Sequence, residues 1–433
     1  TTKSCLLDTI FALASAPGRA GISVIRLSGL EAITAVELIT RSELKGPKPK
    51  LRTVYGPDGS FVDEALILIF SEPYSFTGEN VAEIHLHGSQ AVVASTIKIL
   101  NNISGLRQAE AGEFTRRSLD NGKLDLAQVE GLGDLIDAET EAQLKQAGRV
   151  FTGALGKKSN DWREKLTRAA ALLVATIDFA DEEVPEDVSS EVETLINTVA
   201  NELDKEIVGV HTAERIRSGF EVAIVGAPNL GKSTLLNFLA GRDAAITSSI
   251  SGTTRDIIEV RLDLFGLPVT FLDTAGIRVA SDLVEEIGIG RALERASLSD
   301  LRIVLSKDGE HPDGMEPKTT DIVCIAKDDE GLKGGISGIT GAGVDDLKNN
   351  IWCIFNKKAQ NVGIATRERH RTSMVNAQGF LNNAIVSLGY GPEQYDITAE
   401  EIRAATHALD SLIGRIGLEN VLDEVFSSFC LGK

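Results

Sequence analysis

The sequence predicts a multidomain protein built from α/β plus all-α parts, with one α/β domain inserted into a mainly helical region. Short apolar runs between turn residues fill residues 1–117, and apolar residues spaced by three or four fill residues 118–215. Strand-like and helix-like runs alternate over residues 216–358, and helical spacing returns over residues 359–433. A chain of 433 residues is long enough for roughly two to four domains.

Each region has elements that can be placed in order. In the first, "GISVIRLSG" and "DEALILIFSEPYSFTGE" predict strands bounded by Gly, Pro and Ser. In the second, "KLDLAQVEGLGDLIDA" and "WREKLTRAAALLVATIDF" predict helices. In the third, the strands "FEVAIVGAP", "PVTFLDTAG", "DLRIVLS" and "DIVCIAK" and helices such as "KSTLLNFLAG" predict βαβ units with a mostly parallel sheet. The fourth has two further helices, in "RERHRTSMVNAQGFLNNAIVSLG" and "ITAEEIRAATHALDSLIGRIG".

Charge and cysteine content restrict the function classes. The net charge of −19 makes the chain a poor partner for nucleic acid, so any RNA contact needs a local basic patch or a partner protein. The four cysteines show no CxxC spacing, which disfavours a zinc site and indicates a reducing compartment. The apolar runs are too short to span a bilayer, and no signal-peptide pattern is present. We therefore expect a cytoplasmic protein with no membrane part.

The strongest motif is a phosphate-binding loop. "GAPNLGKS", from Gly226 to Ser233, has the spacing GxxxxGKS between a predicted strand and a predicted amphipathic helix. Backbone N–H groups of such a loop surround the phosphates of a nucleotide, Lys232 reaches the β and γ phosphates, and Ser233 can bind Mg²⁺. The sequence therefore predicts a nucleotide-binding domain.

Two later segments favour GTP hydrolysis. "SGTTRD" offers Thr253 and Thr254 in a loop that can close on the γ-phosphate and magnesium. "FLDTAG" ends a strand with Asp273, which would hold Mg²⁺ directly or through water, and with Gly276, whose N–H would contact the γ-phosphate. Together with the phosphate-binding loop, these segments predict a Ras-like P-loop GTPase domain.

The residue after "DTAG" is Ile277, which cannot orient the attacking water as a glutamine does in Ras-like enzymes. Spacing alone leaves Glu285 and Glu286 as the nearest carboxylates for this task, or as a solvated helix face.

The guanine-reading loop is incomplete. "AKDD" has Lys327 and Asp329 of an NKxD pattern, but Ala326 replaces the asparagine. Asp329 can still accept hydrogen bonds from guanine, while each lost hydrogen bond costs about 1 kcal/mol. We expect guanine preference with weakened affinity, with Ser337 and Gly338 near the base. The predicted nucleotide-binding residues are Asn229, Leu230, Gly231, Lys232, Ser233, Thr234, Ser248, Ser249, Ile250, Ser251, Gly252, Thr253, Thr254, Asp273, Thr274, Ala275, Gly276, Lys327, Asp329, Ser337 and Gly338.

The whole chain resembles the MnmE (TrmE) family of tRNA-modification GTPases. The likeness rests on "PGRAGISVIRLSG", "PYSFTGENVAEIHLHG", "AGEFTRRSLDNGKLDLAQVEGLGDLIDA", "IDFADEEV", "GAPNLGKSTLLN", "SGTTRD", "DTAGIR", "VEEIGIGRA" and the terminal "FCLGK". It implies a tetrahydrofolate-binding and dimerisation domain over 1–117, a helical domain in two parts over 118–215 and 359–433, and a GTPase domain over 216–358.

The resemblance also implies site residues. Glu285 matches the water-orienting glutamate, and Ser233 and Thr254 match the magnesium ligands. Potassium, at a face where two GTPase domains meet, would be held by Asn229, Ser248, Ile250 and Thr253. The folate, 5-formyltetrahydrofolate or a related tetrahydrofolate, would contact Arg26, Glu83, Lys123 and Lys433.

The family implies a homodimer that acts with a FAD-containing partner, MnmG, to install an aminomethyl-type group at C5 of the wobble uridine of certain tRNAs. Family members end in Cys-x-Gly-Lys, so Cys430 is a functional thiol at the folate site or a small buried side chain rather than a lipid anchor. Alternatives to this function are a nucleotide-binding scaffold that does not hydrolyse GTP, a ribosome-assembly GTPase, and a folate-dependent one-carbon transferase with a regulatory domain.

Overall fold

The computed structural model describes residues 8–46, 48–178, 188–242, 259–273, 297–311, 316–331, 334–360, 362–415, 422, 425, 426, 429 and 432. The chain forms two compact units, residues 1–133 with 410–433, and residues 134–409. Each unit has its own hydrophobic core. The predicted combination of α/β and helical parts is confirmed.

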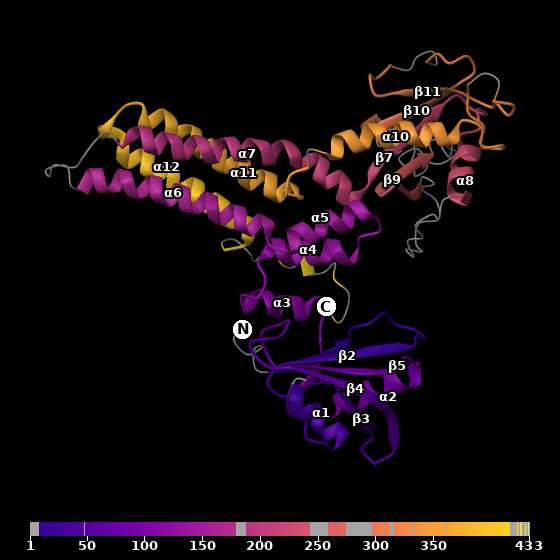
Figure 1. Ribbon diagram of the computed structural model, residues 1–433, viewed down its shortest axis with the longest axis vertical. Helices are drawn as coiled ribbons and strands as arrows, with labels where there is room; N and C mark the ends of the chain where they lie inside the picture. Colours follow the sequence, from indigo (N-terminus) through magenta and orange to yellow (C-terminus); the bar gives the residue numbers. More distant parts are fainter. Residues whose placement is uncertain are drawn as a thin grey trace, which may run out of the picture. The chain divides into compact units, whose positions relative to one another are not determined.

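The N-terminal unit is built on a six-stranded sheet with helices α1 and α2 on one face (Figure 1). The strand order is β3-β4-β5-β2-β1-β6, and all neighbours are antiparallel except β1 and β6. The core lies between this sheet and helices α1 and α2. The elements are β1 (Thr9–Leu13), β2 (Ile22–Ser28), α1 (Ala32–Thr40), β3 (Lys50–Tyr55), β4 (Phe61–Phe70), β5 (Val81–His87), α2 (Gln90–Asn101), β6 (Leu106–Gln108), α3 (Glu113–Asp120) and the 3₁₀ helix η3 (Ser411–Ile413). Helix α4 (Leu126–Ile136) contains the boundary between the units.

Strand alternation gives this sheet two different faces. Ile25, Leu27 and Ile84 point into the core under α1 and α2, so Arg26 and Glu83 point to the opposite face. Polar side chains are therefore available on the face that these two helices leave open.

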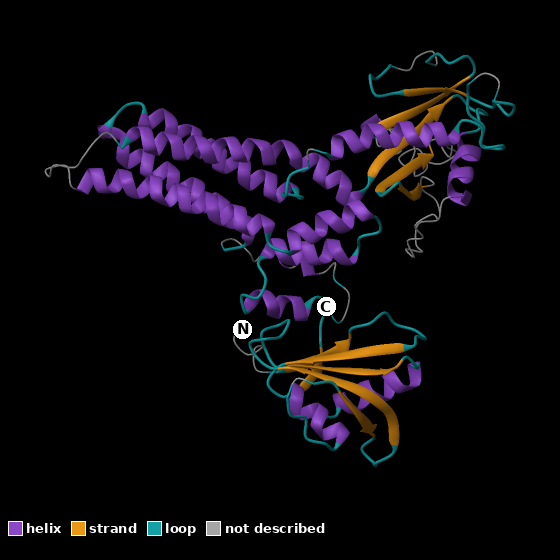
Figure 2. Ribbon diagram, in the orientation of Figure 1, coloured by secondary structure: helices purple, strands orange, loops and turns teal. Residues whose placement is uncertain are grey.

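The second unit begins with a helical bundle, seen as long purple helices in Figure 2. Its apolar residues recur at helical spacing, as the sequence predicts, and include the fully buried Trp162. The elements are α5 (Glu141–Phe151), α6 (Ala154–Asp178), α7 (Ser189–Ser218), α11 (Glu368–Leu388), the 3₁₀ helix η2 (Pro392–Gln394) and α12 (Tyr395–Asp410).

An α/β domain is inserted between α7 and α11. Its sheet has the order β11-β10-β7-β9-β8, parallel throughout except for the β8–β9 hairpin. Helices α8 and α10 share one hydrophobic core with a face of this sheet. The elements are β7 (Phe220–Gly226), α8 (Lys232–Arg242), β8 (Glu259–Leu264), β9 (Leu267–Asp273), β10 (Leu301–Ser306), β11 (Ile322–Ile325) and α10 (Val344–Ala359).

Candidate functional sites

The phosphate-binding motif forms the turn between β7 and α8. Asn229 and Gly231 have left-handed backbone conformations, with φ of 65° and 85°, which turn the chain sharply into the helix. A Cβ at Gly226 would lie 2.4 Å from the carbonyl oxygen of Leu305 on the neighbouring strand, so only glycine fits there. The loop has the tight backbone that lets N–H groups approach phosphates at a helix N-terminus.

Lys232 begins α8 and turns back over this loop. Its ammonium group donates to the carbonyl oxygens of Gly226 at 2.8 Å and Ala227 at 3.0 Å, and the residue is only 6% exposed. Burial lowers the pKa of Lys232, while the nearby charge of Asp273 acts in the opposite direction. A buried cation at the rim of a glycine-rich loop is suited to bind a polyphosphate.

Ser233 and Asp273 meet beside this lysine. The Ser233 Oγ donates to the Asp273 Oδ2 at 2.6 Å, which joins the start of α8 to the end of β9. A hydroxyl and a carboxylate are the hard oxygen ligands that Mg²⁺ prefers. These two residues therefore fit the magnesium site that the sequence predicts.

The candidate base-binding loops lie against the same helix. Ser337 Oγ donates to Asp329 Oδ1 at 2.6 Å, and Lys327 has a left-handed backbone with φ of 59°. A Cβ at Gly338 would lie 2.6 Å from the backbone nitrogen of Leu235 in the first turn of α8. The structure thus brings Asp329, Ser337 and Gly338 close to the phosphate-binding loop.

The remaining described residues of the predicted nucleotide site differ in their burial. Leu230 is buried in the core of the inserted domain, and Asn229 and Thr234 are exposed. The predicted site residues that lie outside the described residues are Ser248, Ser249, Ile250, Ser251, Gly252, Thr253, Thr254, Thr274, Ala275, Gly276, Glu285, Cys430 and Lys433.

Two of the predicted folate residues, Arg26 and Glu83, lie on the face of the N-terminal sheet opposite α1 and α2. Arg26 on β2 and Glu83 on β5 lie opposite each other and form an ion pair of 2.9 Å. The Arg26 guanidinium also lies over the rings of Phe76, at 5.6 Å, and Phe114, at 5.9 Å. Lys123 reaches the loop that contains Phe76, because its Nζ donates to the carbonyl oxygen of Pro73 at 3.0 Å.

The end of the chain packs into the same unit. Phe426 and Phe429 form a small apolar cluster with Val129. A Cβ at Gly432 would lie 2.3 Å from the carbonyl oxygen of Leu13, the last residue of β1. The backbone next to Lys433 therefore runs against the strand that pairs with β2, which carries Arg26.

A buried ion cluster in this unit does not follow from the sequence patterns. Arg117 on α3 donates to Asp8 Oδ1 at 2.9 Å and to Glu79 Oε2 at 3.1 Å, and Ser28 Oγ also donates to Glu79 Oε2 at 2.7 Å. Arg107 pairs with Asp8 and with Glu113. The acids lie 109 and 38 residues from Arg117 in the sequence, so no local spacing signals the cluster.

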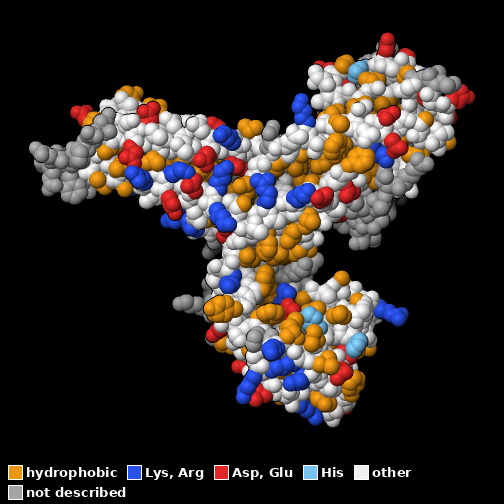
Figure 3. Space-filling model, in the orientation of Figure 1, with side chains coloured by type: hydrophobic (Ala, Val, Ile, Leu, Met, Phe, Trp, Pro, Cys, Tyr) orange, Lys and Arg blue, Asp and Glu red, His pale blue; other side chains and the backbone are white. Residues whose placement is uncertain are grey.

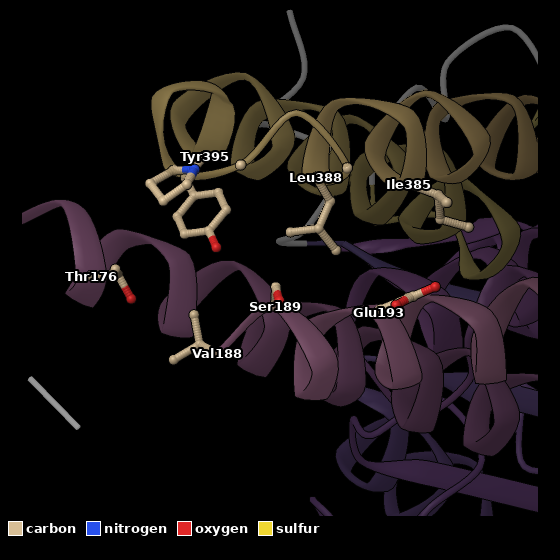
Figure 4. A pocket seen from close by; sticks show the side chains of 10 residues that line it. Thr176, Val188, Ser189, Glu193, Ile385, Leu388 and Tyr395 are labelled. Atoms are coloured by element: carbon tan, nitrogen blue, oxygen red, sulfur yellow. The ribbon is translucent and has the colours of Figure 1, made fainter. Parts of the chain in front are cut away.

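The helical bundle has a pocket of about 630 Å³ that contains none of the predicted site residues. In Figure 4, side chains from α6 and α7, such as Thr176 and Glu193, face Ile385, Leu388 and Tyr395 from α11 and α12. Across the described segments, no group of three or more His, Cys, Asp or Glu residues is arranged to hold a metal ion. Likewise, none of the helices in those segments is long and apolar enough to cross a bilayer.

The sheet, the tight loop, the buried Lys232 and the Ser233–Asp273 pair define a P-loop nucleotide-binding protein with an added helical bundle and a second α/β unit. Two family models match the chain, "GTP-binding protein TrmE N-terminus" over residues 9–123 and "MnmE helical domain" over residues 126–430. The chain belongs to the MnmE family.

Curated relatives agree with these matches over their full length. The tRNA modification GTPase MnmE of Roseobacter denitrificans is 58% identical over 429 residues, covering 99% of this chain and 100% of the relative. The protein of the same name from Ruegeria pomeroyi is 54% identical with the same coverage. Among solved structures, the G domain of the T. maritima FeoB iron transporter is 22% identical and covers 32% of this chain and 98% of its own, with a TM-score of 0.23.

Proposed function

We propose that this chain binds GTP at the β7–α8 loop and hydrolyses it during the modification of tRNA. It belongs to a family whose relatives are named as tRNA modification GTPases, one of them 58% identical over the full length. The observation that carries the site assignment is the 2.6 Å contact between Ser233 and Asp273 beside the buried Lys232. A cation, a hydroxyl and a carboxylate are the groups that bind phosphates and Mg²⁺ in P-loop nucleotide-binding proteins, which supports this assignment.

Each residue of the site has a distinct task. Lys232 neutralises phosphate charge, Ser233 and Thr254 bind Mg²⁺, and Asp273 supports the same ion directly or through water. Asp329 accepts hydrogen bonds from guanine, with Ser337 holding its carboxylate at 2.6 Å. Glu285 orients the attacking water, a task that Ile277 cannot perform.

A monovalent cation completes the proposed mechanism. Asn229 is exposed in the phosphate-binding loop, and its amide oxygen is a suitable ligand for K⁺. Ser248, Ile250 and Thr253 are the other proposed ligands. Bound K⁺ would supply positive charge where the transition state develops negative charge between the β and γ phosphates.

The N-terminal unit is the proposed folate site. The Glu83 carboxylate can accept hydrogen bonds from the donor-rich edge of a pteridine, and Arg26, Lys123 and Lys433 suit the carboxylates of 5-formyltetrahydrofolate. Phe76, which is partly exposed beside Arg26, offers a ring face for packing. Cys430 is the candidate thiol at this site.

The proposed assembly is a homodimer through the N-terminal unit that works in the cytoplasm with MnmG. A FAD-containing partner would contribute the flavin chemistry, and the product would be a C5 aminomethyl-type wobble uridine.

GTP hydrolysis in potassium and in sodium tests the proposal. The purified protein should hydrolyse GTP with Mg²⁺ much faster in K⁺ than in Na⁺, and should hydrolyse ATP slowly in both. The variant Ser233→Ala should lose activity at low Mg²⁺ because one ion ligand is missing. Equal, slow turnover in both salts would refute the potassium site, and equal use of ATP would refute guanine recognition by Asp329.

A further inference from the structure

The N-terminal unit carries a basic edge, defined here as Arg41, Lys45, Lys48, Lys50 and Arg52. Residues 41–52 contain these five cations and a single acid, Glu43. In the whole chain, Lys and Arg make up 44 of 433 residues, about one in ten, and the net charge is −19. The basic edge is therefore a strong local exception to the charge of the molecule.

The basic edge follows an exposed border of the sheet. Arg41 ends α1, Lys45 and Lys48 lie in the following loop, and Lys50 and Arg52 lie on β3, the outermost strand next to β4. Lys45 and Lys48 are exposed. Lys50 and Arg52 are two positions apart on a strand, so they share a side at a spacing of about 7 Å. The cations thus form a row rather than a scattered group.

Two of these five charges, Lys50 and Arg52, are bonded to neutral groups. Arg52 Nε donates to Ser42 Oγ at 2.9 Å and Arg52 Nη1 to the carbonyl oxygen of Leu51 at 2.8 Å, while Lys50 donates to the carbonyl oxygen of Lys45. Lys45 pairs with Glu43 at 2.7 Å, but both side chains are largely exposed, so the pair is weak. The row keeps a surplus of positive charge for an external partner.

Aromatic side chains lie at the turn end of the β3–β4 hairpin, where β3 ends and β4 begins. The Arg41 guanidinium lies over the ring of Tyr55 at 4.9 Å, and Tyr55 is paired with Phe61 across the two strands. Phe61 is 68% exposed, so its ring is accessible to a partner at this end of the hairpin. Exposed rings beside cations are the surface on which unpaired bases stack.

The helical bundle provides a contrast. In Figure 3, its Lys and Arg side chains lie among Asp and Glu side chains on the face that is drawn. Arg168 pairs with Glu191 at 2.6 Å, and Lys165 pairs with Asp161. On that face, the charges of the bundle largely compensate each other.

We propose that the basic edge, together with Phe61, is an RNA-binding surface on which Lys45, Lys48, Lys50 and Arg52 contact phosphates and Phe61 stacks on an unpaired base. The inference rests on the proposed function in tRNA modification, because an acidic chain that contacts RNA directly needs a local basic patch of this kind. An alternative explanation for the exposed lysines is that they protect the edge strand β3 from pairing with strands of other molecules. That explanation does not account for an exposed aromatic ring at the end of the same hairpin.

Binding of an unmodified tRNA transcript to the full chain, measured by fluorescence anisotropy at several salt concentrations, tests this surface. The triple variant Lys48→Gln, Lys50→Gln, Arg52→Gln should bind roughly tenfold or more weakly at about 0.1 M salt, and the slope of log K against log salt should fall by about 2 to 3. Phe61→Ala should weaken binding about fivefold with an unchanged slope, because stacking releases no counterions.

A matched control removes three charges elsewhere. Lys145, Arg168 and Arg403 are exposed side chains of the second unit, each paired with an acid. The control variant Lys145→Gln, Arg168→Gln, Arg403→Gln has the same net charge as the test variant and should keep wild-type slope and affinity. If both variants lose affinity equally, only net charge matters and the surface assignment is wrong.

A single variant, sedimentation and GTP hydrolysis without tRNA distinguish a failure of the RNA surface from a failure of the proposed GTPase function. Lys48→Gln alone, at an exposed loop position, should lower the slope by about 1 even if the triple variant folds poorly. An unchanged tRNA affinity with a shift of oligomeric state in sedimentation would mean that the edge contacts a second copy, and would overturn the RNA assignment. GTP hydrolysis without tRNA should be unchanged in all variants, and its absence in the wild type would contradict the proposed function whatever the RNA result.

Discussion

Gly338 shows how one residue sets the distance between the base-binding loop and the phosphate-binding helix. A Cβ at this position would lie 2.6 Å from the backbone nitrogen of Leu235 and 2.7 Å from the carbonyl carbon of Thr234. Both are backbone atoms that cannot move aside. The variant Gly338→Ala should therefore push the loop with Ser337 away from α8 and weaken GTP and GDP binding about tenfold to a hundredfold, equivalent to about 1–3 kcal/mol of overpacking.

Isothermal titration with GDP measures this loss, and α8 offers the matched control. Gly241 lies in α8, and a Cβ there meets no atom within 4 Å. Gly241→Ala should leave affinity unchanged and raise stability slightly, because alanine favours helix. Wild-type affinity in Gly338→Ala would mean that the loop does not contact the nucleotide.

At the scale of elements, α7 fixes the segment that leaves the inserted domain. The carboxylate of Glu206 accepts from Lys158 Nζ and from the backbone nitrogen of Ile364, both at 2.7 Å, and the residue is 6% exposed. Glu206→Leu would leave a partly buried ammonium and a partly buried N–H without this acceptor, and should lower the free energy of unfolding of the second unit by about 1–2 kcal/mol. Urea unfolding followed by the fluorescence of Trp162 and Trp352, which both lie in the second unit, measures the loss.

Two variants on α7 make this measurement specific. Glu206→Gln keeps an oxygen for the Ile364 N–H but loses the charge, so it should lose about half as much stability. Glu214 is 39% exposed on the same helix, and Glu214→Leu should change stability by less than about 0.5 kcal/mol. Equal effects of Glu206→Leu and Glu214→Leu would show that the contact to the linker contributes nothing.

Helix α3 joins the N-terminal unit through ion pairs whose strength depends on pH. Burial alone would raise the pKa of Glu113 and of Asp8, but hydrogen bonds and charges from Arg107 and Arg117 hold both pKa values below 4.5 and 3.8, their ordinary values. Folding lowers the pKa of both carboxyl groups. Their stabilisation of the folded state is therefore complete at a pH above the pKa values of the unfolded chain. It is lost as the pH falls through the lower pKa values of the folded state. The N-terminal unit should therefore lose stability below about pH 4.5.

The variant Arg117→Met tests this dependence. It should lower the stability of the N-terminal unit at neutral pH by about 3 kcal/mol and make the decline between about pH 5 and pH 3 shallower. Both tryptophans, Trp162 and Trp352, lie in the second unit, so amide hydrogen exchange in β2 and β5 is the suitable readout. A decline with the same slope in the variant would mean that other carboxylates control the acid response.

At the scale of the whole molecule, the sequence predicts what is local. The phosphate-binding loop is one run of eight residues, so its position and the proposed roles of Lys232 and Ser233 follow from spacing alone. The Arg117 cluster depends on partners up to 109 residues away, and the contact of Gly432 with Leu13 joins the two ends of the chain. Such pairs depend on the order of the strands in the sheet and on the return of the C-terminal segment to the N-terminal unit. Local residue spacing encodes neither. The roles of Glu285 and of the potassium ligands remain predictions from the family resemblance.

The division into two units, each with its own core, leads to a last prediction. GDP that binds only the folded second unit should stabilise that unit by about 2.7 kcal/mol at a hundredfold excess over its Kd. Hydrogen exchange should then slow in β7, β9 and α8 and stay unchanged in β4 and β5 of the N-terminal unit. The variant Lys232→Ala, which lacks the phosphate-binding ammonium, should show no change in either unit. Equal protection of both units by GDP would mean that they unfold as one cooperative body, and a folate would then be expected to protect the GTP site as well.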